Sequence, residues 1–130
     1  MRSVNFLLDT NIIIYLLLRE KKYVDFLAES RDKKFGISVA SLMEVLVGVN
    51  DANEGRIVAS ELSQFEIIPI DKAIGLETAE ILRVKKAKNL KDTRFIDIII
   101  AQTAIGLGIP LITNNPKDFK LFRKLKVITP

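Results

Sequence analysis

The sequence contains neither cysteine nor histidine among its 130 residues. The lack of cysteine excludes disulfides, thiolate zinc sites, iron–sulfur clusters and cysteine nucleophiles. The lack of histidine excludes Ser-His-Asp catalysis, histidine acid–base chemistry and metal sites with an imidazole ligand. Any catalysis by this chain therefore depends on carboxylates, amides, hydroxyls, lysine or arginine.

The sequence also lacks a long apolar run near its N-terminus. Polar residues at positions 9–11 interrupt the apolar stretch 6–18. The remaining piece, 12–18, is far shorter than the roughly 20 residues that a membrane-spanning helix needs. We therefore expect neither a signal peptide nor a membrane partner, and a soluble protein of the cytoplasm.

Hydrophobic residues make up 48% of the chain and charged residues 28%, which is typical of a globular protein. A chain of this length buries about two-thirds of its unfolded surface, so we expect one domain over residues 1–130. The net charge of +4 is uneven, because residues 1–65 carry eight basic and nine acidic side chains and residues 66–130 carry twelve and seven. The basic half favours a polyanionic partner, most simply nucleic acid, although solubility explains so small a charge equally well.

Short apolar runs alternate with helical patterns along the chain. We expect strands at 4–8, 35–37, 67–70, 111–113 and 126–128. We expect helices at 11–19, 23–30, 39–49, 55–65, 72–88 and 94–107, and a short one after Asn115-Pro116. This alternation predicts a three-layer α/β/α sandwich around a parallel sheet. Ligands bind beyond the carboxyl ends of such strands, which places Asp9 and residues 113–115 at the same edge.

Three acidic residues stand where the local pattern is apolar. Asp9 ends the first strand, Glu44 lies in the apolar segment 39–47, and Asp97 lies in the segment 95–101. Both helices are apolar nearly all round, which predicts buried helices, and an unpaired buried carboxylate is costly. If the fold brings the three acids together, their repulsion calls for a cation among them. Oxygen ligands without histidine or cysteine favour Mg²⁺ or Mn²⁺ over zinc, and such an ion can serve phosphate hydrolysis.

Each of these acids also has a structural explanation. Asp9 can cap the helix that begins near residue 11. Glu44 completes the pattern Ser41-x-x-Glu44 of a capping box, which would start that helix at Ser41. Asp97 would lie past the first turn of a helix capped by Asp92 or Thr93, where a chance ion pair with Arg94 would explain it.

A fourth acid, Asp118, follows Asn115-Pro116 as in an ordinary helix start, and it could also bind a metal or orient water. Basic residues cluster ahead of the helix that holds Asp97: Arg83, Lys85, Lys86, Lys88, Lys91 and Arg94. They could guide a phosphate backbone or form a solvated helix face. Arg94 is the best candidate among them for a contact with a substrate phosphate.

Taken together, these segments resemble the PIN-domain family, and within it the VapC-type toxin ribonucleases. The resemblance covers essentially the whole chain and rests on four segments in order: Leu7-Leu8-Asp9-Thr10-Asn11, 38–44, 97–104, and Thr113-Asn114-Asn115 with Asp118-Phe119. It implies a parallel sheet of about five strands between helices. It also implies Mg²⁺- or Mn²⁺-dependent endonuclease action on RNA.

The resemblance assigns roles to individual residues. The acids that match the family's metal-binding positions are Asp9, Glu44 and Asp97, and Asp118 matches a less constant fourth acid. The residues that match its polar positions are Thr10, Thr113 and Asn115. Many relatives have an aspartate where this chain has Asn114 and Asn115, and a neutral amide binds Mg²⁺ more weakly. This departure puts a second metal site in doubt.

The resemblance further implies a homodimer and a small cognate antitoxin that blocks the site. The apolar segments 12–18 and 23–27 suit such an interface, and core packing explains them equally well. Two other functions stay open. One is a PIN nuclease of RNA maturation, and the other is a non-catalytic RNA- or protein-binding module, which Asn114 and Asn115 favour.

Overall fold

The computed structural model describes residues 3–88 and 94–130. In this part of the chain, five strands form one sheet: β1 (Phe6–Leu8), β2 (Phe35–Ser38), β3 (Glu66–Ile68), β4 (Leu111–Ile112) and β5 (Val127–Ile128). Their order is β3-β2-β1-β4-β5, and every neighbouring pair is parallel. After β1, the chain adds β2 and β3 on one side of it, and then β4 and β5 on the other side. The gap between β1 and β4 is therefore a topological switch point, where open α/β sheets bind ligands.

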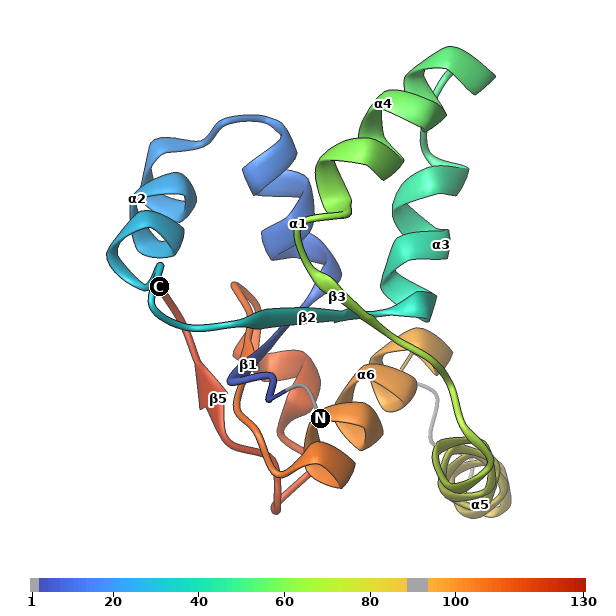
Figure 1. Ribbon diagram of the computed structural model, residues 1–130. Coiled ribbons are helices and arrows are strands. Elements are labelled where there is room, and N and C mark those ends of the chain that lie inside the picture. Colours follow the sequence, from blue (N-terminus) through green and yellow to red (C-terminus); the bar gives the residue numbers. More distant parts are fainter. Residues whose placement is uncertain (1–2, 89–93) are drawn as a thin grey trace.

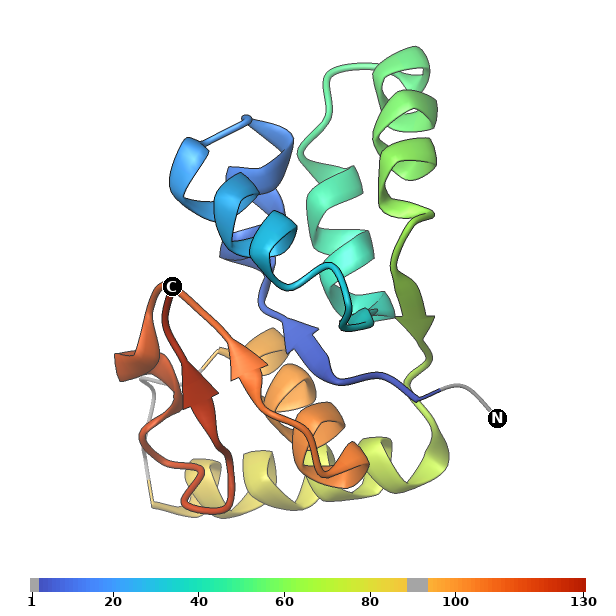
Figure 2. The same ribbon diagram turned by 60° about the vertical axis from the view of Figure 1, so that its left-hand side comes forward.

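Helices cover both faces of this sheet (Figures 1 and 2). One side carries α1 (Thr10–Leu17), α2 (Lys21–Glu29), α3 (Val39–Val47) and α4 (Ala52–Leu62). The other side carries α5 (Lys72–Ala87) and α6 (Phe95–Leu107), and the 3₁₀ turn η1 (Pro116–Phe119) follows β4. The predicted three-layer α/β/α architecture is confirmed. Observed elements differ from the predicted ranges by a few residues at their ends.

Adjacent residues of β1 belong to different hydrophobic cores. Leu8 packs with α1, α2 and α4, and Leu7 packs with α6. Both side chains are completely buried, because successive side chains of a strand point to opposite faces. The central strand is therefore held from both sides just before Asp9.

Three expectations about helices are wrong. The capping-box interpretation of Glu44 fails because α3 begins at Val39, where the Ser38 hydroxyl accepts a 3.0 Å hydrogen bond from the N–H of Ala40. Helix α3 is also not buried all round, since Val47 is 85% exposed.

The third correction concerns α6. Its N-cap residue is Arg94, so Asp97 lies in the first turn and not beyond it. Asp92 and Thr93, the expected caps, lie outside the described residues. Within residues 3–88 and 94–130, no helix has the length and apolar character that crossing a membrane requires.

Candidate active site

Asp9 occupies the carboxyl end of the central strand and also begins α1. Its Oδ1 accepts a 2.8 Å hydrogen bond from the N–H of Thr10, and its Oδ2 accepts a 2.7 Å bond from the hydroxyl of Thr113. The side chain is only 5% exposed. The pKa of Asp9 is raised: burial is the largest cause, the two hydrogen bonds oppose it, and the charges of Glu44 and Asp118 add to it. The capping explanation of Asp9 is confirmed, and it is compatible with a second role.

Asp97 faces the same region from the first turn of α6. It is 6% exposed. Burial is the main cause that raises its pKa to about 6, and the charge of Asp9 adds to this shift while Arg94 opposes it. A carboxylate so perturbed in a hollow of the surface is typical of functional sites.

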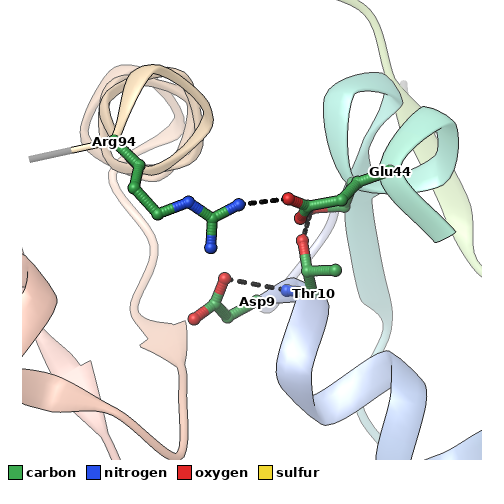
Figure 3. A network of polar contacts seen from close by, with 5 residues as sticks. Asp9, Thr10, Glu44 and Arg94 are labelled. Carbon is green, nitrogen blue, oxygen red and sulfur yellow. Dashed lines mark hydrogen bonds and ion pairs between the residues drawn. The ribbon is translucent and has the colours of Figure 1, made fainter. Parts of the chain in front are cut away.

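Glu44 and Arg94 form an ion pair across the site. Nη2 of Arg94 donates to Oε2 of Glu44, which joins the start of α6 to the middle of α3. Figure 3 shows the guanidinium extending toward Glu44, with Asp9 and Thr10 beside the pair. The Glu44 carboxylate is the main cause of a raised Arg94 pKa. The alternative explanation of Asp97, a chance ion pair with Arg94, is not supported, because Arg94 pairs with Glu44.

The loop after β4 brings the fourth acid to the site. Nδ2 of Asn115 donates a 2.6 Å hydrogen bond to Oδ2 of Asp118, and the N–H of Asn115 donates a 3.0 Å bond to the Thr113 hydroxyl. Thr113 is fully buried, and its hydroxyl therefore links Asp9 to the loop that carries Asp118. Asn115 begins η1 directly before Pro116, as predicted, and Asp118 lies within it.

These residues surround one cavity of ≈ 600 Å³. The charged residues of its lining are Asp9, Glu44, Asp97, Asp118 and Arg94. Thus four carboxylates that are far apart in the sequence meet at the switch point of the sheet, with one guanidinium among them. Of the basic residues that the sequence singled out, Arg83 instead pairs with Glu80 on α5, Lys85 is buried, and Lys91 lies outside the described residues.

The donor chemistry of the cavity suits a hard divalent cation. Its carboxylates are oxygen ligands of the kind that Mg²⁺ and Mn²⁺ prefer. Burial is the main cause of the raised pKa values of Asp9 and Asp97, and the charges of neighbouring acids add to it. As the side chains stand, however, no three acidic groups in the described ranges are grouped tightly enough to hold one ion. Three of the four carboxylates already accept hydrogen bonds from protein side chains: Asp9 from Thr113, Glu44 from Arg94, and Asp118 from Asn115.

An aromatic pair and two further polar residues complete the site. Tyr15 lines the cavity and stacks on Tyr23, with ring centroids 4.6 Å apart and planes at 9°. The Tyr23 hydroxyl donates a 2.7 Å hydrogen bond to Oδ1 of Asn114, and Oδ1 of Asn11 accepts a 3.2 Å bond from the N–H of Asn114. Sequence reasoning gave Tyr15, Tyr23 and Asn11 no role here. Helical spacing does place Asn11 and Tyr15 on the same face of α1.

Thr10 and Ser41 join two helices beneath the ion pair. The Thr10 hydroxyl donates a 3.0 Å hydrogen bond to the hydroxyl of Ser41, and both side chains are buried. This bond fixes the start of α1 against α3, the helix that carries Glu44. Ser41 therefore holds two helices together and does not cap one.

Comparison with known proteins gives matches along nearly the whole chain. Residues 6–125 match the family model of the PIN domain. Ribonuclease VapC from Rickettsia bellii (strain RML369-C) is 30% identical in an alignment that covers 95% of this chain and 94% of that protein. The tRNA(fMet)-specific endonuclease VapC from Shigella flexneri is 26% identical over 121 residues, which cover 90% and 91%.

Solved structures show the same fold. VapBC2 from Rickettsia felis, bound to a DNA fragment from its promoter, is similar with a TM-score of 0.82 and 25% identity, covering 98% of this chain and 99% of that one. A toxin–antitoxin complex from Klebsiella pneumoniae is similar with a TM-score of 0.77 and 31% identity, covering 97% and 98%.

Proposed function

Because this chain belongs to the PIN domain family and is similar throughout to VapC ribonucleases, we propose that it is a Mg²⁺- or Mn²⁺-dependent endoribonuclease, the toxin of a toxin–antitoxin pair. The observation that carries the proposal is the meeting of four carboxylates around one cavity at the switch point of the sheet. The proposed nuclease domain extends over residues 1–130.

The proposed ligands of the cation are Asp9, Asp97 and Glu44. When bound, such an ion supplies Lewis acidity and offsets the negative charge that builds on a phosphate during hydrolysis. Asp9 and Asp97 are both buried, and Asp9 is anchored by Thr10 and Thr113. Glu44 is held by Arg94.

Other residues are proposed to act on the substrate. Asn115 fixes Oδ2 of Asp118, so that Oδ1 can accept a proton from the attacking water. Arg94 lines the cavity beside the acids and offers a forked set of donors that suits a phosphate. Thr10, Thr113 and Asn115 act indirectly, by holding the carboxylates in place.

The proposed partners follow from the relatives. The solved relatives include toxin–antitoxin complexes, which supports a small antitoxin as the partner of this chain. Apolar side chains at the surface of α1 and α2, Ile14 at 43%, Leu18 at 65% and Val24 at 38% exposure, support a homodimer or antitoxin interface. An RNA substrate supports a location in the cytoplasm.

The proposal is tested by cleavage of single-stranded RNA in the presence of Mn²⁺. We expect Asp9→Asn and Asp97→Asn to abolish cleavage while circular dichroism shows a folded protein. Asp51→Asn is the matched control, since Asp51 caps α4 away from the cavity and asparagine caps a helix equally well. Full cleavage in excess EDTA would contradict metal dependence.

Two further measurements separate the other functions. Absence of Mn²⁺ binding at millimolar concentration would favour a non-catalytic module, in which the acids serve structure alone. Expression without an antitoxin should arrest growth if the protein is a toxin. Normal growth with an active nuclease would instead indicate a role in RNA maturation.

A further inference from the structure

We propose that Arg94 is an internal counter-ion of the site, which holds Glu44 in the metal-free protein and must release it for a divalent cation to bind. This inference rests on the proposed function, because it assumes that Glu44 is a metal ligand. It adds that cation binding and the position of Arg94 are linked.

The charges of the cavity make Arg94 the natural competitor of a metal ion. Among the described residues that line the cavity, Arg94 is the one basic side chain against four acidic ones. Its guanidinium interacts not only with Glu44 but also with the charges of Asp97 and Asp118. One positive group thus already offsets part of the repulsion that a divalent cation would otherwise relieve.

The partners of the other acids differ from Arg94 in one decisive respect. Asp9 accepts from a hydroxyl and a backbone N–H, and Asp118 accepts from an amide. A carboxylate oxygen has more than one lone pair, so it can bind a cation and still accept a hydrogen bond from such a neutral donor. A guanidinium carries a full positive charge, so it and a divalent cation repel each other at the same carboxylate. Glu44 is therefore the acid at which the protein's own donor and a metal exclude one another.

The structure also allows Arg94 to move. Its side chain is 62% exposed, and that of Glu44 is 25% exposed. Ion pairs that face water are weak, because solvent screens them and long side chains lose freedom in them. Arg94 is the N-cap residue of α6, but its side chain makes no capping hydrogen bond, so release of the side chain leaves the hydrogen bonds of the helix intact.

Linkage sets the size of the expected effect. In molecules in which the ion pair is formed, Glu44 is not available to a cation. The apparent affinity for the cation is therefore the intrinsic affinity multiplied by the fraction of molecules in which the ion pair is broken. Removing an exposed ion pair of ordinary strength should then tighten cation binding by about threefold to fivefold. By linkage, a saturating concentration of the cation should in turn remove the Arg94–Glu44 contact.

The test is a calorimetric titration with Mn²⁺ of four proteins: the wild type, Arg94→Gln, Glu44→Gln and the double variant. We expect Arg94→Gln to lower the Mn²⁺ Kd by about threefold to fivefold in the wild-type background. The decrease should be clearly smaller when Glu44 is already glutamine, because only the charge that faces Asp97 and Asp118 is then removed. Arg83→Gln is the control for net charge, since Arg83 pairs with Glu80 outside the cavity, and it should not change the Kd.

Three results would overturn the inference. An unchanged or higher Kd in Arg94→Gln would show that Arg94 does not compete with the cation. An equal decrease of the Kd in the wild-type and Glu44→Gln backgrounds would show that Arg94 acts only by repelling the cation, without a role for Glu44. Absence of Mn²⁺ binding by the wild type and by Arg94→Gln alike would refute the metal site, and the proposed function together with this inference.

Discussion

The hydroxyl of Thr113 donates a 2.7 Å hydrogen bond to Oδ2 of Asp9, and so joins the ends of β4 and β1 across 104 residues of sequence. The same hydroxyl accepts from the N–H of Asn115. One buried oxygen therefore sets both the orientation of the central carboxylate and the start of the loop that carries Asp118.

Replacing Thr113 by valine should destabilise the protein by about 1–3 kcal/mol, because the buried carboxylate of Asp9 loses a donor while the shape of the side chain is kept. We expect a lower midpoint in urea denaturation and slower RNA cleavage. Thr113→Ser keeps the hydroxyl and should retain most of the stability. Equal stability of the valine variant and the wild type would contradict the role given to this bond.

The pH dependence of stability should reveal Asp97. Its pKa lies near 6 in the folded protein against an ordinary value of 3.8, so between these values the folded state binds more protons than the unfolded state. The free energy of unfolding of the metal-free protein should therefore fall as the pH rises from about 4 to 6, by at most about 3 kcal/mol from this group. Burial raises the pKa of Asp9 as well, which acts in the same direction.

Denaturation of Asp97→Asn in EDTA over the same pH range checks this prediction. Without the titrating group, the variant should lose less stability on going to neutral pH, and it should be more stable than the wild type at pH 7. A wild-type profile that rises between pH 4 and 6, with a parallel profile for the variant, would contradict the raised pKa.

Addition of Mn²⁺ should stabilise the wild type, because the ion binds the folded state and relieves repulsion among the carboxylates. At a free concentration of 100 times the Kd, the gain should be about 2.7 kcal/mol. Thermal unfolding measures it, and EDTA should reverse it. The gain should shrink at pH 5, where protons compete with the ion at Asp97. An equal gain in a protein that carries both Asp9→Asn and Asp97→Asn would indicate binding elsewhere.

Removal of the Tyr23 hydroxyl should loosen the loop after β4. Tyr23→Phe keeps the ring that stacks on Tyr15 but loses the bond to Asn114, and the expected cost is about 1 kcal/mol. Hydrogen exchange of the Asn114 and Asn115 amides should become faster. Tyr15→Phe is the matched control, since it preserves the stack and the Tyr23 hydroxyl, and it should leave this exchange unchanged.

Much of the architecture could be predicted because local patterns determine it. The apolar run that ends at Asp9 and the signal of Asn115-Pro116 both gave elements close to those observed. The position of Asp9 and Thr113 at one edge followed from a parallel sheet, in which the carboxyl ends of strands meet.

The features that could not be predicted depend on tertiary contacts, or on which of two equally suitable residues caps a helix. Ser38 and Ser41 can both cap a helix, and Ser38 does so because β2 ends there. The pairing of Arg94 with Glu44 spans 50 residues and depends on how α6 approaches α3. Spacing in the sequence carries no information on such a contact and offers Arg94 only Asp97 as a nearby acidic partner.

The order Leu7-Leu8-Asp9 makes the position of the Asp9 carboxylate depend on the packing of both hydrophobic cores. Each leucine belongs to a different hydrophobic core, and the carboxylate comes next in the chain. A change of volume in either core therefore reaches Asp9 through at most two backbone units. Substitutions in the interior on either face of the sheet should therefore shift the carboxylate of Asp9.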